Sequence, residues 1–308
     1  MTTAAERSLI DRDTAHLVHP LHNPAAHESA KVWVGGKGAY IVDSEGNEYI
    51  DCLSGLWCNT AGNGRPELAD AAAAQMRQMG FVSGYAGSSN PRAIELSERL
   101  AHLTYPSINH FYLTSGGGES TDSNIKLARY YWKLKGKPDK TKVISRIWGY
   151  HGVTMAGMCA TGIPAYWAMF EPRIPGFSHI PSPYPYLYEA PEGAKSQGIA
   201  AADELEKQIL EEGADTVAMF IAEPVQGAGG VIVPQEDYFK RIREICDQYE
   251  VLLVADEVIT GFRLHPRGAQ EFYGIDSDMG TYGKIIGGGM PIGLLAGKSK
   301  YLDALDGG

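Results

Sequence analysis

The sequence predicts an α/β fold, in which a mainly parallel sheet carries helices on both of its faces. Two observations support this prediction. From about residue 92 onward, segments with the composition of strands alternate with segments that have the periodicity of helices, and this order is typical of parallel sheets. In addition, the helix expected at residues 238–249 leads into the strand expected at 251–255, a crossover that is right-handed by default.

The first 91 residues predict smaller elements. Residues 31–53 indicate a β-hairpin, because apolar alternation resumes after the turn-forming run from Asp43 to Asn47. Residues 66–79 predict a helix, with Pro66 in its first turn and Gly80 just past its end. The residues that follow, 80–91, are rich in turn formers and predict a loop.

The rest of the chain follows the alternating pattern, with one interruption. Six prolines between residues 161 and 191 predict little regular structure in that segment. Elsewhere the sequence predicts helices at about 92–103, 119–135 and 238–249, and strands at 111–114, 142–145, 217–222 and 251–255.

Composition limits the classes of function. The chain has 308 residues, of which 44% are hydrophobic, so it can bury a sizeable core as one or two domains. Its formal net charge is -10, which disfavours nucleic-acid binding and binding to anionic membranes. Its 4 cysteines form no C-x-x-C pair and no zinc-type spacing. No signal-peptide core or membrane-span pattern is present, and we expect a cytoplasmic protein without a metal site.

Lys284 is the most informative single residue. It lies in a glycine-rich segment, with Gly287-Gly-Gly289 and Pro291 after it, and it follows the apolar run that closes on Asp256. A lysine held in such a turn near a buried carboxylate suits an amine that forms a covalent imine with a cofactor aldehyde. Asp256 would end a strand, where a carboxylate can pair with a protonated ring nitrogen and keep it charged.

Further polar groups are expected at the same edge of the sheet. Gly116-Gly-Gly118 stands between a strand and a helix, where it fits either a phosphate site or a flexible turn. Tyr150 and His151 follow the strand at 142–145, so that the tyrosine ring either stacks on a flat cofactor or packs internally. Glu223 and Gln226 follow the strand at 217–222 and bring a third polar loop to this edge.

Two nucleotide-binding motifs compete with this interpretation, and both fail. An apolar strand that ends in Asp256-Glu257 resembles the magnesium-binding strand of nucleotide hydrolases, which also need a G-x-x-x-x-G-K-[ST] loop. The nearest match, at residues 293–299, is one residue too short and follows the acidic pair instead of preceding it. A dinucleotide-binding loop fails because position 292 is Ile where the motif needs glycine.

Three segments carry a resemblance to a known family: Glu223-Pro-Val-Gln-Gly227, Ala255-Asp-Glu-Val-Ile-Thr-Gly-Phe262 and Tyr282-Gly-Lys-Ile-Ile-Gly-Gly-Gly-Met-Pro-Ile-Gly293. Together they resemble the class III pyridoxal-phosphate-dependent aminotransferases. Gly55-Leu-Trp57 and Ser115-Gly-Gly-Gly-Glu119 with Asp122 are similar to the ω-amino acid and amine:pyruvate members. The resemblance covers the chain from about residue 30 onward.

The resemblance implies the fold type I of pyridoxal-phosphate-dependent transferases, with a sheet of the seven-stranded type. It implies that Lys284 bonds to pyridoxal 5'-phosphate and later moves a proton between the substrate carbon and the cofactor, and that Asp256 pairs with the pyridine nitrogen. It further implies phosphate contacts from Gly117 and Gly118, ring contacts from Tyr150 and Val258, contacts near the ring hydroxyl from Glu223 and Gln226, a supporting hydrogen bond from His151, and a substrate pocket near Trp57 and Tyr85.

The chain departs from the family pattern in two places. Gly116-Gly-Gly118 stands where the family usually has Ser-Gly-Ser, so that two hydroxyl groups are absent while the backbone donors remain. The sequence also ends at Gly308, before the region that in the family holds a phosphate-binding threonine and a carboxylate-binding arginine. We therefore expect a C-terminally truncated chain, in which residues 1–65 contribute to a small domain and residues 66–308 form an incomplete large cofactor-binding domain.

The resemblance implies a homodimeric transaminase, with the loop at residues 81–90 reaching across to the other subunit. It would transfer an amino group from an ω-amino acid or a primary amine to a keto acid such as pyruvate, in two ping-pong half-reactions. An aminomutase of the glutamate-1-semialdehyde type shares several of these motifs, and a non-catalytic fragment is a third possibility. Trp57 and Tyr166-Trp167 favour the transaminase.

Overall fold

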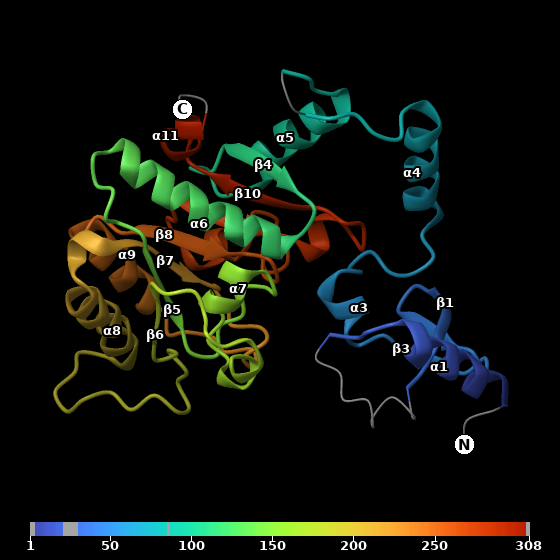
Figure 1. Cartoon of the computed structure of the whole chain (residues 1–308), viewed down its shortest axis with the longest axis horizontal. Coiled ribbons are helices and arrows are strands. Elements are labelled where there is room, and N and C mark those ends of the chain that lie inside the picture. The colour runs from blue at the N-terminus through green and yellow to red at the C-terminus, as the bar shows by residue number, and fades with distance from the viewer. Residues whose placement is uncertain (1–3, 21–29, 85–86, 306–308) are drawn as a thin grey trace. The chain divides into compact units, whose positions relative to one another are not determined.

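A computed structural model describes residues 4–20, 30–84 and 87–305 of the protein. The chain forms two compact units, Met1–Ser83 and Gly84–Gly308, whose elements are labelled in Figure 1. The helix α4 (Pro66–Gln78) belongs to the first unit. The domain boundary expected after residue 65 stays a prediction.

The N-terminal unit contains a small antiparallel sheet of β1 (Trp33–Lys37), β2 (Tyr40–Asp43) and β3 (Glu48–Ile50). The buried carboxylate of Asp43 holds the turn between β2 and β3, because it accepts the backbone N–H groups of Glu45 at 3.0 Å and Asn47 at 2.9 Å. These contacts confirm the expected hairpin. Among its described residues this unit has the helices α1 (Ala4–His16), α3 (Ser54–Trp57) and α4.

The C-terminal unit is organised around a seven-stranded sheet with the order β4-β10-β9-β8-β7-β5-β6. β10 runs antiparallel to both of its neighbours, and the pairs between β9, β8, β7, β5 and β6 are parallel. The mainly parallel α/β sheet is therefore confirmed. The strands are β4 (His110–Thr114), β5 (Lys142–Arg146), β6 (Phe177–Ile180), β7 (Val217–Ala222), β8 (Leu252–Asp256), β9 (Met279–Tyr282) and β10 (Gly293–Gly297).

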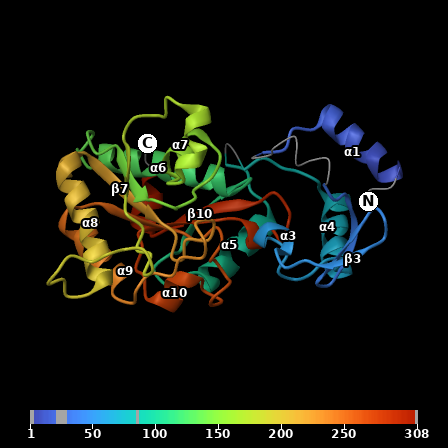
Figure 2. The same ribbon diagram turned by 90° about the horizontal axis from the view of Figure 1, so that it is seen from below.

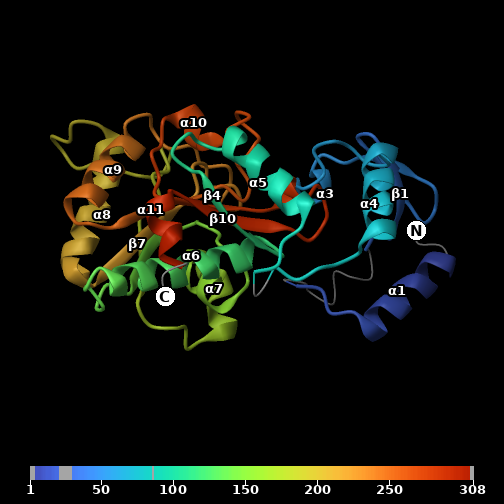
Figure 3. The same ribbon diagram turned by 90° about the horizontal axis from the view of Figure 1, so that it is seen from above.

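Helices cover both faces of this sheet. Figures 2 and 3 show the sheet between a layer that contains α6 (Gly117–Leu134) and α7 (Met155–Ala160) and a layer that contains α9 (Tyr238–Gln248). The side chains of β8 alternate accordingly, since Leu253 packs with the core of α8 (Gln197–Glu212) and α9, whereas Leu252 and Val254 pack with that of α6. Further helices among the described residues of this unit are α5 (Pro91–Leu103), α10 (Ala269–Tyr273) and α11 (Ser299–Leu302).

Several boundaries differ from the sequence-based expectations. β6 lies within the proline-rich segment, where little regular structure was expected. This segment forms a strand because it pairs with β5. α6 begins at Gly117, two residues before the expected start at Glu119. The segment that nearly matches a P-loop is strand β10 followed by α11, which confirms the rejection of that motif. Within the described part of the chain, no helix combines the length and apolarity needed to span a membrane.

Candidate functional site

The carboxyl ends of the parallel strands β5, β7, β8 and β9 lead into loops that meet at one cavity of about 190 Å³. This is the edge at which ligands bind to open α/β sheets. Most of the site residues expected from the sequence meet here. The cavity is lined by Gly117, Gly118, Tyr150, His151, Gly152, Val153, Glu223, Asp256, Val258, Ile259 and Lys284.

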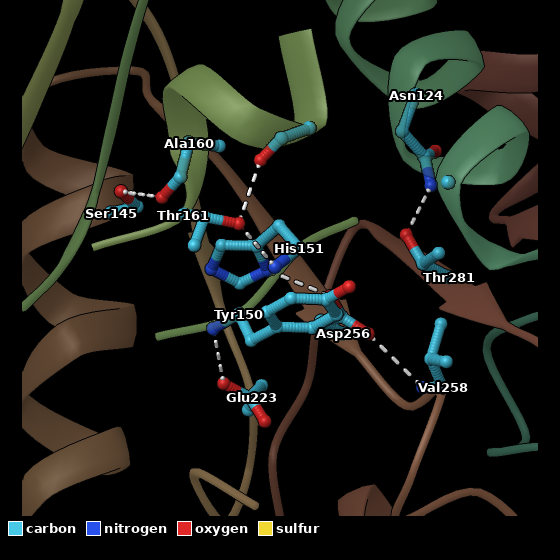
Figure 4. Close-up of polar contacts among 12 residues, drawn as sticks. Asn124, Ser145, Tyr150, His151, Ala160, Thr161, Glu223, Asp256, Val258 and Thr281 are labelled. Atoms are coloured by element: carbon cyan, nitrogen blue, oxygen red, sulfur yellow. Dashed lines mark hydrogen bonds and ion pairs between the residues drawn. The ribbon is translucent and has the colours of Figure 1, made fainter. Parts of the chain in front are cut away.

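Asp256 and His151, which both line the cavity, contact each other through buried side chains. The Nδ1 atom of His151 lies 2.7 Å from Oδ2 of Asp256, and Figure 4 marks this contact with a dashed line. The other carboxylate oxygen of Asp256 accepts the backbone N–H of Val258 at 3.0 Å. Because both side chains are almost fully buried, the carboxylate is held in one orientation. Nε2 of His151 is buried and has no hydrogen-bond partner among the described residues.

Glu223 joins two of the loops. Its Oε1 accepts the backbone N–H of Tyr150 at 2.9 Å (Figure 4), and its Oε2 accepts that of Gly227 at 2.9 Å. Burial raises the pKa of Glu223 above its ordinary value, and the nearby His151 opposes this effect. The guanidinium of the buried Arg146 donates to the backbone carbonyl of Glu223. Glu223 therefore holds the loop that carries Tyr150 against the end of β7.

The amino terminus of α6 opens onto the cavity. Gly116 precedes the helix and supplies no side-chain cap, and the first N–H groups of a helix have no partner within it. A Cβ on Gly117 would lie 2.9 Å from Cγ2 of Val258, and a Cβ on Gly152 would lie 2.9 Å from Cα of Gly118. These close approaches require glycine, and together with the helix dipole they make the site suitable for an anion.

Lys284 is half-buried and directly follows the turn after β9. Its φ of 47° lies in the left-handed region, which is costly for a residue with a side chain and is found more often at functional sites. Gly283, just before it, approaches the start of α6, because a Cβ there would lie 3.3 Å from Cα of Gly117. Lys284 and Asp256 thus line the same cavity.

Three of the expected site residues are not among the described residues that line the cavity. Gln226 is buried, but its amide donates to the carbonyl of Ile147 at 2.9 Å and accepts the hydroxyl of Ser182 at 2.6 Å. Trp57 belongs to the N-terminal unit, in a turn where Ser54–Trp57 all have positive φ. Tyr85 lies outside the described residues.

The structure also adds residues that sequence reasoning did not select. Gly152, Val153 and Ile259 line the cavity, and each stands within two residues of a selected one, which is the signal that could have found them. Arg146 was missed for a different reason. It ends an apolar strand and looks like a surface residue in the sequence, whereas only 1% of it is exposed.

Comparisons with known proteins agree with this geometry. The family model described as aminotransferase class-III matches residues 23–308. A putrescine–pyruvate aminotransferase of Pseudomonas aeruginosa is 40% identical over 283 residues, which are 91% of this chain and 62% of the relative. This chain therefore spans less than two thirds of that relative's length.

Two solved structures extend the comparison. A thermostable (S)-enantioselective omega-transaminase from Thermomicrobium roseum has a TM-score of 0.94 and 42% identity, and the match covers 100% of this chain and 69% of the other. An amine transaminase from an uncultivated Pseudomonas species, solved in its PLP-bound form, has a TM-score of 0.89 and 34% identity, with coverage of 95% and 67%.

Proposed function

Because this chain belongs to the class III aminotransferase family, we propose that its cavity binds pyridoxal 5'-phosphate. We propose further that the protein transfers an amino group from an ω-amino acid or a primary amine to a keto acid such as pyruvate, by a ping-pong mechanism. One observation carries the proposal: Lys284, Asp256 and the glycines at the start of α6 line a single cavity. The relative named for putrescine and pyruvate and the omega-transaminase structure support this choice of substrates.

The start of α6 fits the phosphate group of this cofactor. Gly117 has no space for a side chain, because its Cβ would contact Val258. A Cβ on Gly118 would lie 3.4 Å from Cγ2 of Thr154. Neither glycine places a side chain over the backbone N–H groups at the start of the helix. Backbone donors at a helix amino terminus bind phosphate without any side chain. Gly117 and Gly118 would therefore hold the phosphate.

Asp256 would hold the ring nitrogen in its protonated form. One of its oxygens accepts from Val258 and the other contacts His151, so the carboxylate does not have to reorient when a ligand binds. Bound pyridoxal 5'-phosphate supplies an electron sink for the charge that develops on a substrate carbon. A carboxylate fixed opposite the ring nitrogen stabilises the positive charge that makes this sink effective. Tyr150 and Val258 would lie against the two ring faces.

Lys284 has two roles in this proposal. Its Nζ would bond to the cofactor aldehyde with loss of water in the resting protein. Once the amine of the substrate has displaced it, the freed Nζ would carry the proton between the substrate carbon and the cofactor. The left-handed backbone at Lys284 supports this assignment, since strain of this kind persists where the surrounding structure requires it. The carboxylate of Glu223 would orient the loop of Tyr150, because it accepts the backbone N–H of Tyr150. Gln226 would act indirectly, through its hydrogen bond to the carbonyl of Ile147.

The remaining proposals concern the substrate pocket, the oligomeric state and the cellular location. We propose that Trp57 and Tyr85 contribute to the substrate pocket, and that the protein acts as a homodimer in the cytoplasm. The left-handed turn at Ser54–Trp57 supports a role for Trp57, because a run of positive φ angles is costly for residues with side chains.

The deciding experiment is an assay of the purified, cofactor-loaded protein with a panel of amines and pyruvate, with alanine formation as the readout. The proposal expects alanine formation. Double-reciprocal plots of the initial rate against the amine concentration, at several fixed pyruvate concentrations, are expected to give parallel lines, as in ping-pong kinetics. An aminomutase needs no separate keto acid, so turnover without pyruvate would contradict the transaminase. Absence of any cofactor-dependent absorption in the visible region would contradict the cofactor assignment itself.

A further inference from the structure

The side of α6 that faces the sheet is unusual in its first half, because it buries polar side chains. Ser120, Thr121 and Asn124 have no exposed surface, whereas the second half of the same face carries apolar residues such as Ile125, Ala128 and Trp132. A buried polar group is unfavourable unless it is hydrogen-bonded. The contacts of these polar side chains therefore need an explanation.

Two of them connect α6 to β9. The amide of Asn124 donates through Nδ2 to Oγ1 of Thr281 at 2.8 Å and to the carbonyl of Gly280 at 3.2 Å, and Figure 4 shows Asn124 on the helix opposite Thr281 on the strand. One turn earlier, the hydroxyl of Ser120 lies 2.6 Å from Oγ1 of Thr114 and 3.0 Å from the carbonyl of Gly116, and its longest contact, at 3.5 Å, is with the carbonyl of Tyr282 on β9. We refer to Ser120, Asn124 and Thr281 as the polar seam.

The seam leads directly to the cavity. Along it, the helix and the strand run in opposite directions, since Ser120 faces Tyr282 and Asn124, four residues later, faces Thr281 and Gly280. The next contact toward the cavity is between the backbones of Gly117 and Gly283. Thus the seam ends where the first turn of α6 meets the residue before Lys284.

We propose that the polar seam is a positioning element, which fixes the distance between Lys284 and the amino terminus of α6. This inference rests on the proposed function, in which those two parts hold the aldehyde and the phosphate of one cofactor. Directional hydrogen bonds set the register of a helix along a strand, whereas apolar packing alone tolerates small shifts. A shift of about 1 Å in a catalytic group can lower a rate by about 100-fold.

The test replaces the seam with apolar groups of similar shape. Thr281→Val replaces the hydroxyl by a methyl group, and Asn124→Leu replaces the amide. The double variant removes both partners of the 2.8 Å bond between the two side chains, and the carbonyl of Gly280 loses only the longer contact at 3.2 Å. Replacing both partners of a buried hydrogen bond can leave stability nearly unchanged. The inference expects the double variant to keep its melting temperature while kcat falls by about tenfold, since a displaced lysine slows the proton transfer.

Two further readouts separate positioning from simple stability. The dissociation constant for pyridoxal 5'-phosphate, measured by absorbance titration, is expected to rise by about tenfold, and the pH midpoint of the visible absorption band is expected to shift. The matched control is Trp132→Phe, because Trp132 lies on the same helix and its Nε1 donates to the carbonyl of Ala218 at 2.8 Å. This control is expected to lower the melting temperature and to leave kcat and the pH midpoint unchanged.

The outcomes are distinct. A wild-type protein that does not bind the cofactor would overturn the proposed function, and this inference with it. If the wild type binds the cofactor and turns over, but the seam variants match it in kcat, cofactor affinity and pH midpoint, the inference alone is overturned. Should the double variant not fold, Thr281→Val decides the matter, because valine has nearly the same shape as threonine.

Discussion

His151 and Asp256 are hydrogen-bonded to each other in the lining of the cavity, with 2.7 Å between Nδ1 and Oδ2 and with both side chains buried. The carboxylate depends on this partner, because an unpaired buried oxygen costs about 1–3 kcal/mol. We predict that His151→Phe lowers kcat by about tenfold, the equivalent of ~1.4 kcal/mol, whereas His151→Asn, which keeps a donor, loses less. Steady-state kinetics with pyruvate and an amine would measure both. Equal rates in the two variants would argue against a role for this hydrogen bond.

Lys284 should be indispensable for the chemistry. Removing the nucleophile of a covalent mechanism lowers kcat by roughly 1000-fold or more, so Lys284→Ala is expected to lose both turnover and the visible absorption band. Lys207→Ala is the matched control. Lys207 is exposed, its Nζ lies 2.7 Å from Oε1 of Glu204, and it does not line this cavity. If Lys284→Ala transaminates at the parental rate, Lys284 is not the residue that bonds to the cofactor.

The backbone of Lys284 gives a separate prediction about stability. Its φ of 47° suits glycine better than any residue with a Cβ. We therefore expect Lys284→Gly to be more stable than Lys284→Ala by about 1 kcal/mol, because alanine keeps the strained conformation. Urea unfolding of the two cofactor-free variants measures this difference. A Lys284→Ala protein as stable as Lys284→Gly would indicate that the backbone relaxes and stores no strain.

Much of the site could be predicted from the sequence, because two acidic residues stand at the ends of apolar segments. Glu223 directly follows β7 and Asp256 ends β8. Both strands are apolar up to that point, and parallel neighbouring strands end at the same edge of the sheet. Glu257 shows the limit of that reasoning. It stands next to Asp256 in the sequence, yet its carboxylate turns away and accepts the hydroxyl of Thr260 at 2.6 Å and the N–H of Gln270 at 2.7 Å.

Other parts of the fold depend on pairings that no local pattern reveals. β9 and β10 contain glycine, which weakens the pattern of a strand, so their strand structure depends on the hydrogen bonds that neighbouring strands supply. β6 is ordered in the same way by β5, through pairs such as Val143 with Phe177. Gln226 illustrates the corresponding problem for side chains, because its position near Glu223 in the sequence does not reveal that its amide bonds to Ile147.

Asp43 makes the N-terminal unit sensitive to acid. Burial opposes ionisation of Asp43, but hydrogen bonds from Asn47, Tyr49 and Lys31 outweigh burial and hold its pKa well below the usual range. A carboxyl group whose pKa is lower in the folded state stabilises the fold above its unfolded pKa of about 4, and this contribution is lost as the pH falls below that value.

We therefore predict that the free energy of unfolding falls below pH 4 in the wild type and that Asp43→Asn loses this dependence. Denaturant unfolding at a series of pH values, followed by a probe in residues 1–83, measures it. Asp11→Asn is the control, because Asp11 is an exposed carboxylate of the same unit. Identical pH dependence in the wild type and Asp43→Asn would show that Asp43 does not control the acid response.

Gly117 and Gly116 offer a sharp test of the phosphate site, because they are neighbours with opposite surroundings. A Cβ on Gly117 would lie 2.9 Å from Val258, whereas a Cβ on Gly116 would meet nothing within 4 Å, and the φ of 176° at Gly116 is open to any residue. Gly117→Ala must therefore displace either Val258, which would lie on one face of the cofactor ring, or the first turn of α6. We expect it to raise the dissociation constant for pyridoxal 5'-phosphate by at least about tenfold, or ~1.4 kcal/mol. Gly116→Ala should change it little, and similar losses in both variants would mean that the close contact with Val258 does not shape the site.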